Sequence, residues 1–445
     1  MLAFMVLAYR WLAPPVGLAP PVARSLRLSL ICLLAYLAFQ IIPLPRSLVE
    51  TLSPARSFSP ARLSSGLDHS SFSSLSVQPA ATFLLLLRVV AYALAFWLAR
   101  QLSFRFAYRR RLLVMPILAI ATMEAIWGIV QVWVGGAHSF AYGSYIAQGS
   151  HFVNRNHYAG LLAMALSLAV AECIVILQTV PQRHSGSTAI QLCLLMVSAS
   201  LILLGILYSL SRMGFVSVMC SWYLIGLMLL RGYLPLKKQL AVLGLPLFLL
   251  AGLLLLSTSE LRARFTEFTS LDKLKNDGRL ALWAEAWDLF RDYPVVGCGL
   301  GSLENASLRP SPMLRRVHHA HNDYLQLLVE LGILGFPIFA ALAWTVFANG
   351  LIGMTSLNPK VRSLALGCTA AMGGLFLHSC VDFQLYVPAN VFVLMWISGI
   401  ASNLGSFRVV TTQETLPKAN RLQHPRRSIL NSIRAAKYPE FLRDY

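Results

Sequence analysis

Residues 318–335 read His-His-Ala-His-Asn-Asp-Tyr-Leu-Gln-Leu-Leu-Val-Glu-Leu-Gly-Ile-Leu-Gly, and the rest of the chain is interpreted around this stretch. Three histidines, an asparagine and an aspartate stand directly before a long apolar run that predicts a membrane-spanning helix. Polar groups beside hydrocarbon cost free energy unless they are paired. Such a cluster therefore either solvates and caps a helix end or carries a function, and its position alone leaves both interpretations open.

The composition of the whole chain is that of a membrane protein. Of its 445 residues, 57% are hydrophobic and 12% are charged, whereas a soluble domain carries about 25% charge. The net charge of +19 is explained by the positive-inside rule and by anionic lipid headgroups, so we expect membrane lipids as partners. No basic motif with interleaved aromatic residues indicates nucleic acid. The seven cysteines have no paired spacing, which argues against a disulfide framework or a zinc site.

Apolar runs near the length of a bilayer-spanning helix recur along the sequence. We expect spans at 26–43, 81–98, 112–134, 158–180, 191–210, 213–230, 240–257, 323–348, 364–381 and 388–404. Basic residues between spans, most clearly Arg100 to Arg111, mark the cytoplasmic loops. Residues 1–21 are interrupted by Arg10 and several prolines and indicate an interfacial or re-entrant segment, although a further span stays open.

This topology divides the chain into four parts. N-terminal transmembrane helices (1–257) precede a long periplasmic loop (258–322), C-terminal transmembrane helices (323–404) and a basic cytoplasmic tail (405–445). Residues 46–80, rich in Ser and Pro, predict an external loop.

Two segments of the long loop are predicted in more detail. Residues 279–293 predict an amphipathic helix, lying on the membrane or on the bundle, with Leu280, Trp283, Trp287 and Phe290 on one face. Residues 297–302 predict a flexible turn and not a dinucleotide fingerprint, because no strand precedes them.

The topology gathers polar residues on the external face, namely 152–160, Arg212, Arg279, 318–322 and Asp382. A guanidinium matches phosphate oxygens bidentately, so Arg212 and Arg279 are candidate phosphate ligands. The alternative for Arg212 is snorkelling toward lipid headgroups. A neutral histidine can take a proton from a hydroxyl. Arginines with a histidine base suit attack of a hydroxyl on a carbon that bears a diphosphate leaving group, with no metal required.

Other functions compete with this chemistry. His319, His321 and Asp323 alternate as metal ligands do on a strand, but Asp323 begins a helix and a fourth ligand is missing. An ion path for transport could use charged residues in or near the spans, which are Glu124, Glu172, Glu330, His378 and Arg88. They are not spaced as a relay and no inverted repeat is visible, so we expect structural pairing inside the bundle, for example of an acid with Arg88. A purely structural partner in an envelope-assembly complex is the third alternative.

The pattern His321-Asn322, Gly332, Gly335 resembles the signature of the O-antigen ligase and O-antigen polymerase superfamily. Further stretches resemble motifs of this family in the same order, namely 152–160, Ser211-Arg212-Met213-Gly214, 278–299 and 378–388, with Met213 standing where Gly is more usual. The resemblance implies about twelve helices, so we expect a bundle of about 10–12 transmembrane helices with one long external loop carrying short helices.

The resemblance also implies the chemistry, a metal-independent, inverting transfer of a glycan from undecaprenyl diphosphate, without a cofactor. By position His321 is the catalytic base, with His319 as its possible substitute. Arg212 and Arg279 hold the diphosphate, and Arg155 is a weaker third candidate. Supporting roles fall to Asn322, Asn154, Asn156, Gly332, Gly335 and Asp382.

Members of this family differ in their acceptor. Ligases transfer the glycan to the lipid A core, polymerases transfer it to a second lipid-linked glycan, and some relatives glycosylate proteins. The shared signature does not choose between these acceptors. We favour the ligase, for which the signature is named, on this associational ground alone. A lipid-linked glycan transporter is the more distant alternative. The expected location is the bacterial inner membrane, multi-pass, with the active face in the periplasm.

Overall fold

The structure is a computed structural model that describes residues 19–58, 71–106, 111–134, 149–179, 186–229, 278–307 and 318–404. Most of these residues are helical, and their one strand pairing joins β1 (Leu44–Pro45) to β2 (Phe72–Ser73). The structure thus confirms the predicted all-α polytopic membrane fold.

Seven of the described helices are long and apolar enough to cross a membrane. They are α2 (Arg24–Ile41), α5 (Pro79–Arg105), α6 (Arg111–Val134), α7 (Arg155–Thr179), α8 (Gly186–Tyr208), α15 (Asp323–Gly353) and α16 (Pro359–His378). Two further apolar helices, α9 (Arg212–Leu229) and α17 (Pro388–Leu404), overlap other predicted spans. The predicted span at 240–257, residues 1–18 and the basic tail lie outside the described residues.

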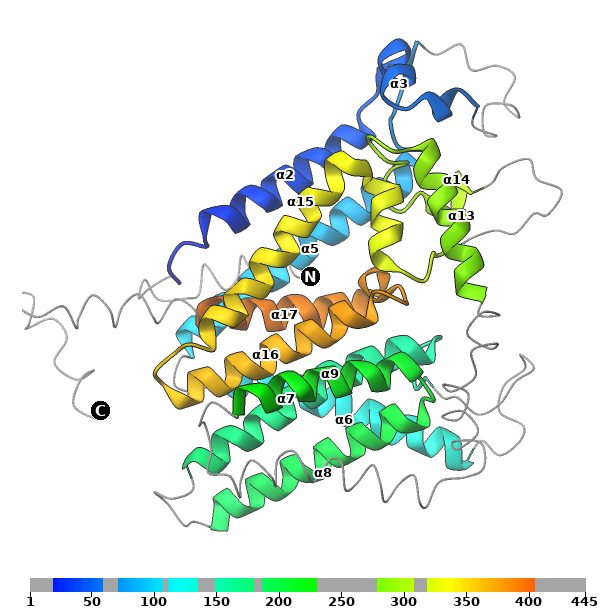
Figure 1. Cartoon of the computed structure of the whole chain (residues 1–445). Coiled ribbons are helices and arrows are strands. Elements are labelled where there is room, and N and C mark those ends of the chain that lie inside the picture. Colours follow the sequence, from blue (N-terminus) through cyan, green and yellow to red (C-terminus); the bar gives the residue numbers. More distant parts are fainter. Residues whose placement is uncertain are drawn as a thin grey trace, which may run out of the picture. The chain divides into compact units, whose positions relative to one another are not determined.

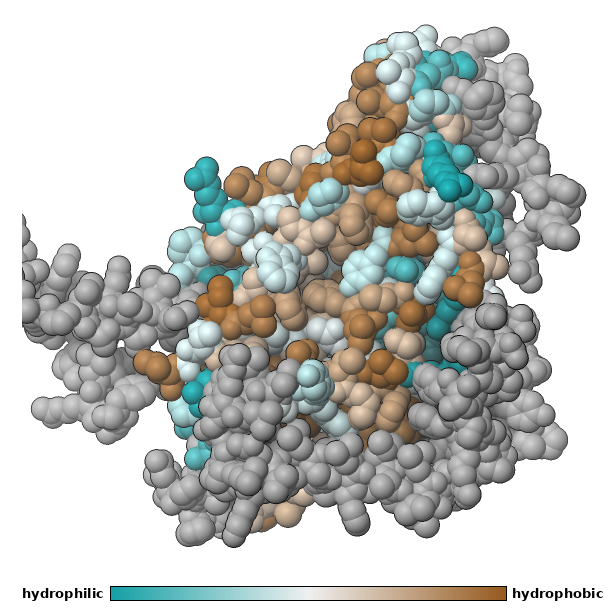
Figure 2. Space-filling view, in the orientation of Figure 1, coloured by the Kyte–Doolittle hydropathy of each residue, from teal (hydrophilic) through white to brown (hydrophobic). Residues whose placement is uncertain are grey.

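Helix α7 forms the centre of the bundle because nearly its whole length is apolar and buried. It packs against α16, α8, α9 and α6, while α17 packs along α5 and α15 (Figure 1). The outer faces of the bundle carry exposed aliphatic residues such as Met123 on α6 and Leu194 on α8, as expected for contact with lipid. Figure 2 shows hydrophobic residues over much of the middle of the visible face and hydrophilic ones gathered toward its edges.

The acidic residues of α6 and α7 are held in separate pairings. Glu172 of α7 accepts a hydrogen bond from Arg111 of α6 at 2.7 Å, so its partner is Arg111 and not Arg88 as expected. Glu124 contacts His151 at 3.1 Å. Within the described part of the chain, these two pairs are separate local contacts and do not form one continuous ion path.

Helix α15 is broken at Gly332, whereas the sequence predicted one continuous span. Gly332 has φ +66° and ψ −176°, a conformation open to glycine almost alone. The segment that follows α13 lies against the break, where Ile333 N–H donates to Pro294 O at 2.9 Å and Cys298 N–H donates to Val329 O at 3.0 Å. Figure 1 shows the two parts of α15 at an angle to each other.

The turn at 297–302, predicted to be flexible, is fixed by hydrogen bonds. Its glycines have positive φ, and a Cβ on Gly297 would lie 2.3 Å from the carbonyl oxygen of Glu330. The fully buried Glu330 carboxylate accepts the N–H groups of Gly301 at 2.7 Å and Leu303 at 3.3 Å, ahead of the short α14 (Leu303–Ala306). The segment around Gly297 approaches α15 so closely that both it and α15 need a glycine at the contact.

The segment at 46–80, predicted as a loop, contains ordered structure in its described parts. It forms α3 (Arg46–Leu52), the 3₁₀ helix η1 (Pro54–Phe58) and β2. Buried Val49 and Leu75 pack with Val296, so this segment covers the chain that crosses the α15 break. The hydrophobic pattern of residues 46–80 did not predict this structure, because the buried residues of this segment contact Val296, which is distant in the sequence.

The predicted amphipathic helix is present as α13 (Gly278–Asp292), and it packs on α15. Its buried face differs from the predicted stripe, because Ala286 and Leu289 are buried whereas Leu280 and Trp287 are 48% and 44% exposed. Figure 1 shows α13 beside the first part of α15.

We predict that Gly332→Ala lowers the free energy of unfolding by at least about 2 kcal/mol. A Cβ at this position would lie 2.3 Å from Val295 O, in a backbone region that alanine avoids. Thermal unfolding of the purified protein in detergent measures the change. Gly373→Ala in α16 is the matched control, since the atoms nearest its Cβ position lie at 3.5 Å or beyond. Equal melting temperatures for the two variants would contradict this role of Gly332.

Candidate functional site

The carboxylate of Asp382 is the centre of the polar cluster. It is fully buried in the segment between α16 and the 3₁₀ helix η6 (Gln384–Tyr386). Its Oδ1 accepts from His321 Nδ1 at 3.1 Å, and its Oδ2 accepts from Asn156 Nδ2 at 2.5 Å. Arg279 Nη2 lies 3.9 Å from Oδ2 and His157 Nε2 lies 3.7 Å from Oδ1. One carboxylate thus joins four segments that are far apart in the sequence.

These contacts keep Asp382 ionised. Burial alone would raise its pKa, but the nearby His157 ring, the hydrogen bond from His321 and the hydrogen bond from the backbone N–H of Phe383 outweigh burial and hold the pKa well below its usual range. A charged group in this environment needs such partners, because an unpaired buried carboxylate is costly.

His321 is held in a strained and specific orientation. Its φ is +49°, a left-handed conformation that a non-glycine residue seldom adopts, and its carbonyl accepts from Trp283 Nε1 at 3.3 Å. With Nδ1–H directed to an ionised carboxylate, the lone pair of the neutral ring is on Nε2. The side chain is 29% exposed, so the ring is within reach of a bound molecule.

The aromatic ring of Phe383 supports three histidines. His319 stacks flat on it with ring centroids 3.9 Å apart, while His157 and His321 meet it edge-on at 4.4 and 4.9 Å. His319 also lies 3.3 Å from Gln326 Oε1. His319 therefore packs as part of the wall, whereas His321 faces the Asp382 carboxylate.

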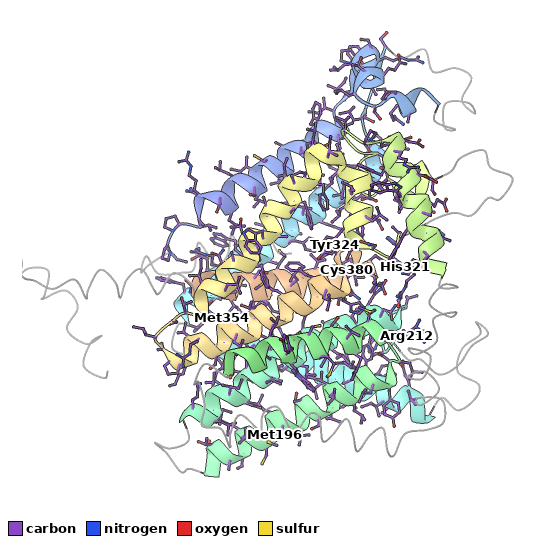
Figure 3. The ribbon with its side chains drawn as sticks, viewed as in Figure 1. Met196, Arg212, His321, Tyr324, Met354 and Cys380 are labelled. Atoms are coloured by element: carbon purple, nitrogen blue, oxygen red, sulfur yellow. The ribbon has the colours of Figure 1, made fainter. Side chains whose placement is uncertain are left out.

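Arg212 begins α9, and Asn154 and Asn156 lie at the start of α7. The starts of these two helices pack closely on each other. Gly214 near the start of α9 packs on Ala159 near the start of α7, where an added Cβ would lie 2.5 Å away. The turn before Arg212 is tight, with Leu210 at φ +52°. Figure 3 shows Arg212, His321, Tyr324 and Cys380 toward one end of the bundle, hereafter the site end, and Met354 toward the opposite end.

The remaining predicted residues divide into caps, close contacts and a neighbour. Asn322 caps α15 by accepting the N–H groups of Tyr324 and Leu325, and Asn154 accepts Asn156 N–H at the start of α7. Gly332 and Gly335 allow close packing, the latter against the ring of Tyr36. Arg155 begins α7, directly before Asn156.

Sequence reasoning missed several residues of the cluster. His157 and Phe383 contact the predicted residues directly, and Gln384 donates to Asn156 O at 3.0 Å. Asn390 donates to the carbonyl of His157 at 2.9 Å. The available signal was the density of polar side chains at 378–390, between two apolar runs on the predicted external face.

No group of three His, Cys, Asp or Glu side chains within the described residues is arranged to hold a metal ion. The ring of His319 lies flat on Phe383, while His321 faces Asp382. The metal site weighed from the alternation of His319, His321 and Asp323 therefore has no matching ligand set in this part of the chain.

Residues 197–340 match a protein-family model that is described as O-antigen ligase. This segment of the chain is therefore similar to the O-antigen ligase family. This match supports a membrane glycosyltransferase-type function in polysaccharide assembly. No curated protein matches the chain.

The segment that matches the family model contains only part of the cluster. It includes Arg212, Arg279, His321 and the break at Gly332, whereas Asn156 and Asp382 lie outside the matched segment on either side. The carboxylate that binds His321 is therefore supplied from beyond the family match, by the connection between α16 and α17.

We predict a pH-dependent contribution of His319 to stability. Burial lowers the pKa of His319 to about 4, the hydrogen bond to Gln326 only partly opposes this, and the nearby His321 lowers it further. The unfolded chain, with an ordinary histidine pKa of about 6.5, binds more protons between these values. Stability from His319 is thus complete above about pH 6.5 and is lost as the pH falls toward 4.

Melting temperatures measured from pH 7.5 to 4.5 test this contribution. His319→Phe keeps a flat ring on Phe383 but cannot titrate, so it should lose less stability on acidification than the parent protein does. His318→Phe, at an exposed position in the same stretch, should keep the loss. Parallel curves for His319→Phe and the parent would refute the prediction.

Proposed function

We propose that the chain is a glycosyltransferase that moves a glycan from undecaprenyl diphosphate to an acceptor hydroxyl, as an O-antigen ligase with the lipid A core as acceptor. The observation that carries the proposal is the contact of Asp382 with His321 Nδ1, beside Arg279 on the same carboxylate. It combines an oriented base with a cation next to the position where a diphosphate would depart.

The reaction follows from these side chains. His321 Nε2 takes the proton of the acceptor hydroxyl while the oxygen attacks the anomeric carbon of the donor sugar. The new carbon–oxygen bond forms as the bond to diphosphate breaks, and the electron pair leaves with the diphosphate oxygen. Attack from the face opposite the leaving group inverts the anomeric centre. The ionised Asp382 stabilises the imidazolium that His321 becomes.

The arginines act on the leaving group. Arg279 Nη2 lies 3.9 Å from the carboxylate, and the planar fork of a guanidinium matches phosphate oxygens. Arg212 comes from the start of α9 at the same end of the bundle (Figure 3). We assign both to the diphosphate, with Arg155 as a further contact, and we propose that no metal ion takes part.

The charge distribution supports a periplasmic site in the bacterial inner membrane. The opposite end of the bundle carries basic residues at the ends of its helices, including Arg24, Arg105, Arg111 and Lys360. Basic residues of this kind mark the cytoplasmic side. The site end, which holds His321, then faces the periplasm.

A transfer assay with purified protein tests the proposal. The donor is undecaprenyl-diphosphate glycan in the presence of EDTA, with the lipid A core added to one tube and no acceptor to the other. Product only with the lipid A core supports the ligase, whereas a ladder of longer glycans on the donor lipid would indicate a polymerase. Product that requires a divalent metal would refute the metal-free mechanism. Movement of donor across proteoliposomes without a new glycosidic bond would indicate a transporter.

The same assay tests the choice of base. His321→Ala should remain in the membrane and lose transfer, while His319→Ala should retain measurable transfer because its ring serves as part of the wall. Equal activity of the two variants would rule out His321 as the base.

For the diphosphate contact, we predict that Arg279→Lys lowers kcat/KM by about 30- to 100-fold, because lysine cannot reproduce a bidentate phosphate contact. Arg291→Lys is the matched control on the same helix, since Arg291 is 68% exposed and pairs with Asp288 at 3.3 Å. Initial rates at several donor concentrations measure the effect. A parent-like rate for Arg279→Lys would remove Arg279 from the donor site.

A further inference from the structure

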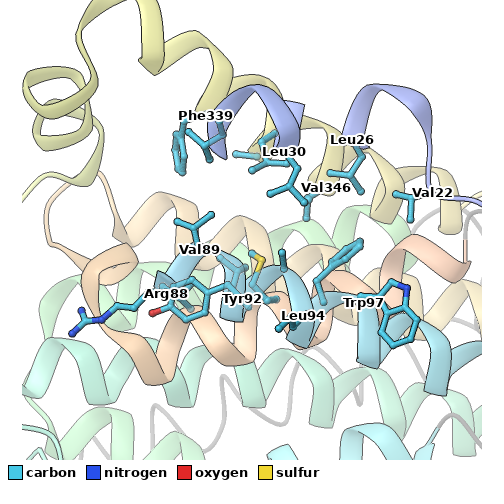
Figure 4. Close-up of a pocket in the computed structure, with 18 of the residues that line it drawn as sticks. Val22, Leu26, Leu30, Arg88, Val89, Tyr92, Leu94, Trp97, Phe339 and Val346 are labelled. Carbon is cyan, nitrogen blue, oxygen red and sulfur yellow. The ribbon is translucent and has the colours of Figure 1, made fainter. Parts of the chain in front are cut away.

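A cavity of about 740 Å³ lies between α2, α5, α15 and α17. Its walls are mostly aliphatic and aromatic, and Figure 4 shows Leu30, Phe339, Tyr92 and Trp97 among the side chains around it. No acidic residue is among the described residues that line it, whereas Arg27, Arg88 and Arg100 all do. The lining suits a hydrocarbon chain with an anionic group.

The cavity is long and runs along the helices. Its lining residues on α5 extend from Leu85 to Gln101, which corresponds to about 24 Å at the rise of an α-helix. That length approaches the thickness of a bilayer's hydrocarbon core, about 30 Å. A lipid chain fits such a space, whereas a sugar would leave its hydroxyl groups without partners.

Arg100 is at the end of the cavity opposite the site. It is only 2% exposed, and its Nε has no hydrogen-bond partner among the described residues. An arginine that merely snorkels to the membrane surface would be exposed. A buried guanidinium without a carboxylate is costly, so this position needs an anion. Arg27, which is exposed, lines the same cavity one turn into α2.

We propose that the cavity binds an anionic glycerophospholipid, with an acyl chain along α5 and its phosphate on Arg100 and Arg27. Phosphate oxygens match the guanidinium fork. The anionic leaflet at the basic end of the bundle supplies such lipids. The phosphate position is separate from the Asp382 cluster, because Arg100 is near the last turn of α5, at the end of the bundle opposite the site end.

The bound chain would also contact the segments that carry the proposed catalytic residues. Leu327 and Leu331, in the part of α15 that directly follows His321, line the cavity. Tyr386, four residues after Asp382, lines it too and donates to Glu330 at 2.5 Å. A lipid chain packed here holds both segments in place, so its loss should loosen the site end of the bundle.

Lipid binding can be measured without any transfer reaction. The delipidated full chain in a neutral detergent is given phosphatidylglycerol, phosphatidylcholine with the same chains, undecaprenyl phosphate or inorganic phosphate. Native mass spectrometry counts retained lipid, and the melting temperature reports stabilisation. We expect one phosphatidylglycerol to be retained and to raise the melting temperature by several degrees, with at least tenfold weaker retention of phosphatidylcholine and no effect of inorganic phosphate.

Variants decide whether this cavity is the site. Arg100→Gln should reduce phosphatidylglycerol retention at least tenfold, whereas Arg24→Gln, an exposed arginine at the same end that does not line the cavity, should leave it unchanged. Ala343→Phe places a ring inside the cavity without changing its charge and should also reduce retention. If Arg100→Gln does not fold, the Ala343→Phe variant still tests whether the lipid binds in this cavity.

Several results would overturn the proposal. Equal retention of phosphatidylglycerol and phosphatidylcholine would refute an anion site, and stabilisation by undecaprenyl phosphate alone would refute a glycerophospholipid occupant. Unchanged retention in Ala343→Phe would place the lipid elsewhere. Because no arm measures transfer, failure of the proposed glycosyltransferase activity leaves this test unaffected.

Discussion

The carboxylate of Asp382 is the interaction on which the site depends. It is fully buried, and it gathers His321, Asn156 and Arg279 from three other parts of the chain. A buried charge in this position is stable only when its polar partners surround it. Removal of one partner from such a buried cluster costs about 3–5 kcal/mol. The assembly of α7, α13, α15 and the α16–α17 connection is therefore coupled to one ionised group.

The second constraint is the close contact of two backbones at the break in α15. Gly332 and Gly297 both have positive φ, and each lies where a Cβ would overlap the other segment. This contact ends the first part of α15 and sets the angle between its two parts. The first part begins at Asp323, two residues after His321. Within the pattern that resembles the family signature, the glycines shape the backbone and the histidine faces the carboxylate.

The sequence predicted the spans well because length and apolar composition are local properties. It also predicted that residues 152–160, Arg212, 318–322 and Asp382 reach one face, and Figure 3 agrees for Arg212 and His321. The central place of Asp382 could not be predicted, since its contact with Asn156 joins residues 226 positions apart. The break at Gly332 and the fixed turn at 297–302 were missed for the same reason, because each is stabilised by the other. The apolar stripe on α13 was misplaced because packing on α15, and not periodicity, selected the buried face.

In the proposed reaction His321 and Asp382 act as a single catalytic unit, and a double-mutant cycle in kcat tests this most directly. His321→Ala, Asp382→Asn and the double variant are compared with the parent in the transfer reaction. We expect Asp382→Asn to lower kcat by about 10²- to 10⁴-fold, the usual contribution of a general base. The double variant should be no slower than His321→Ala alone, because residues that act as a unit are not additive. Losses that multiply in the double variant, or a parent-like kcat for Asp382→Asn, would contradict the account.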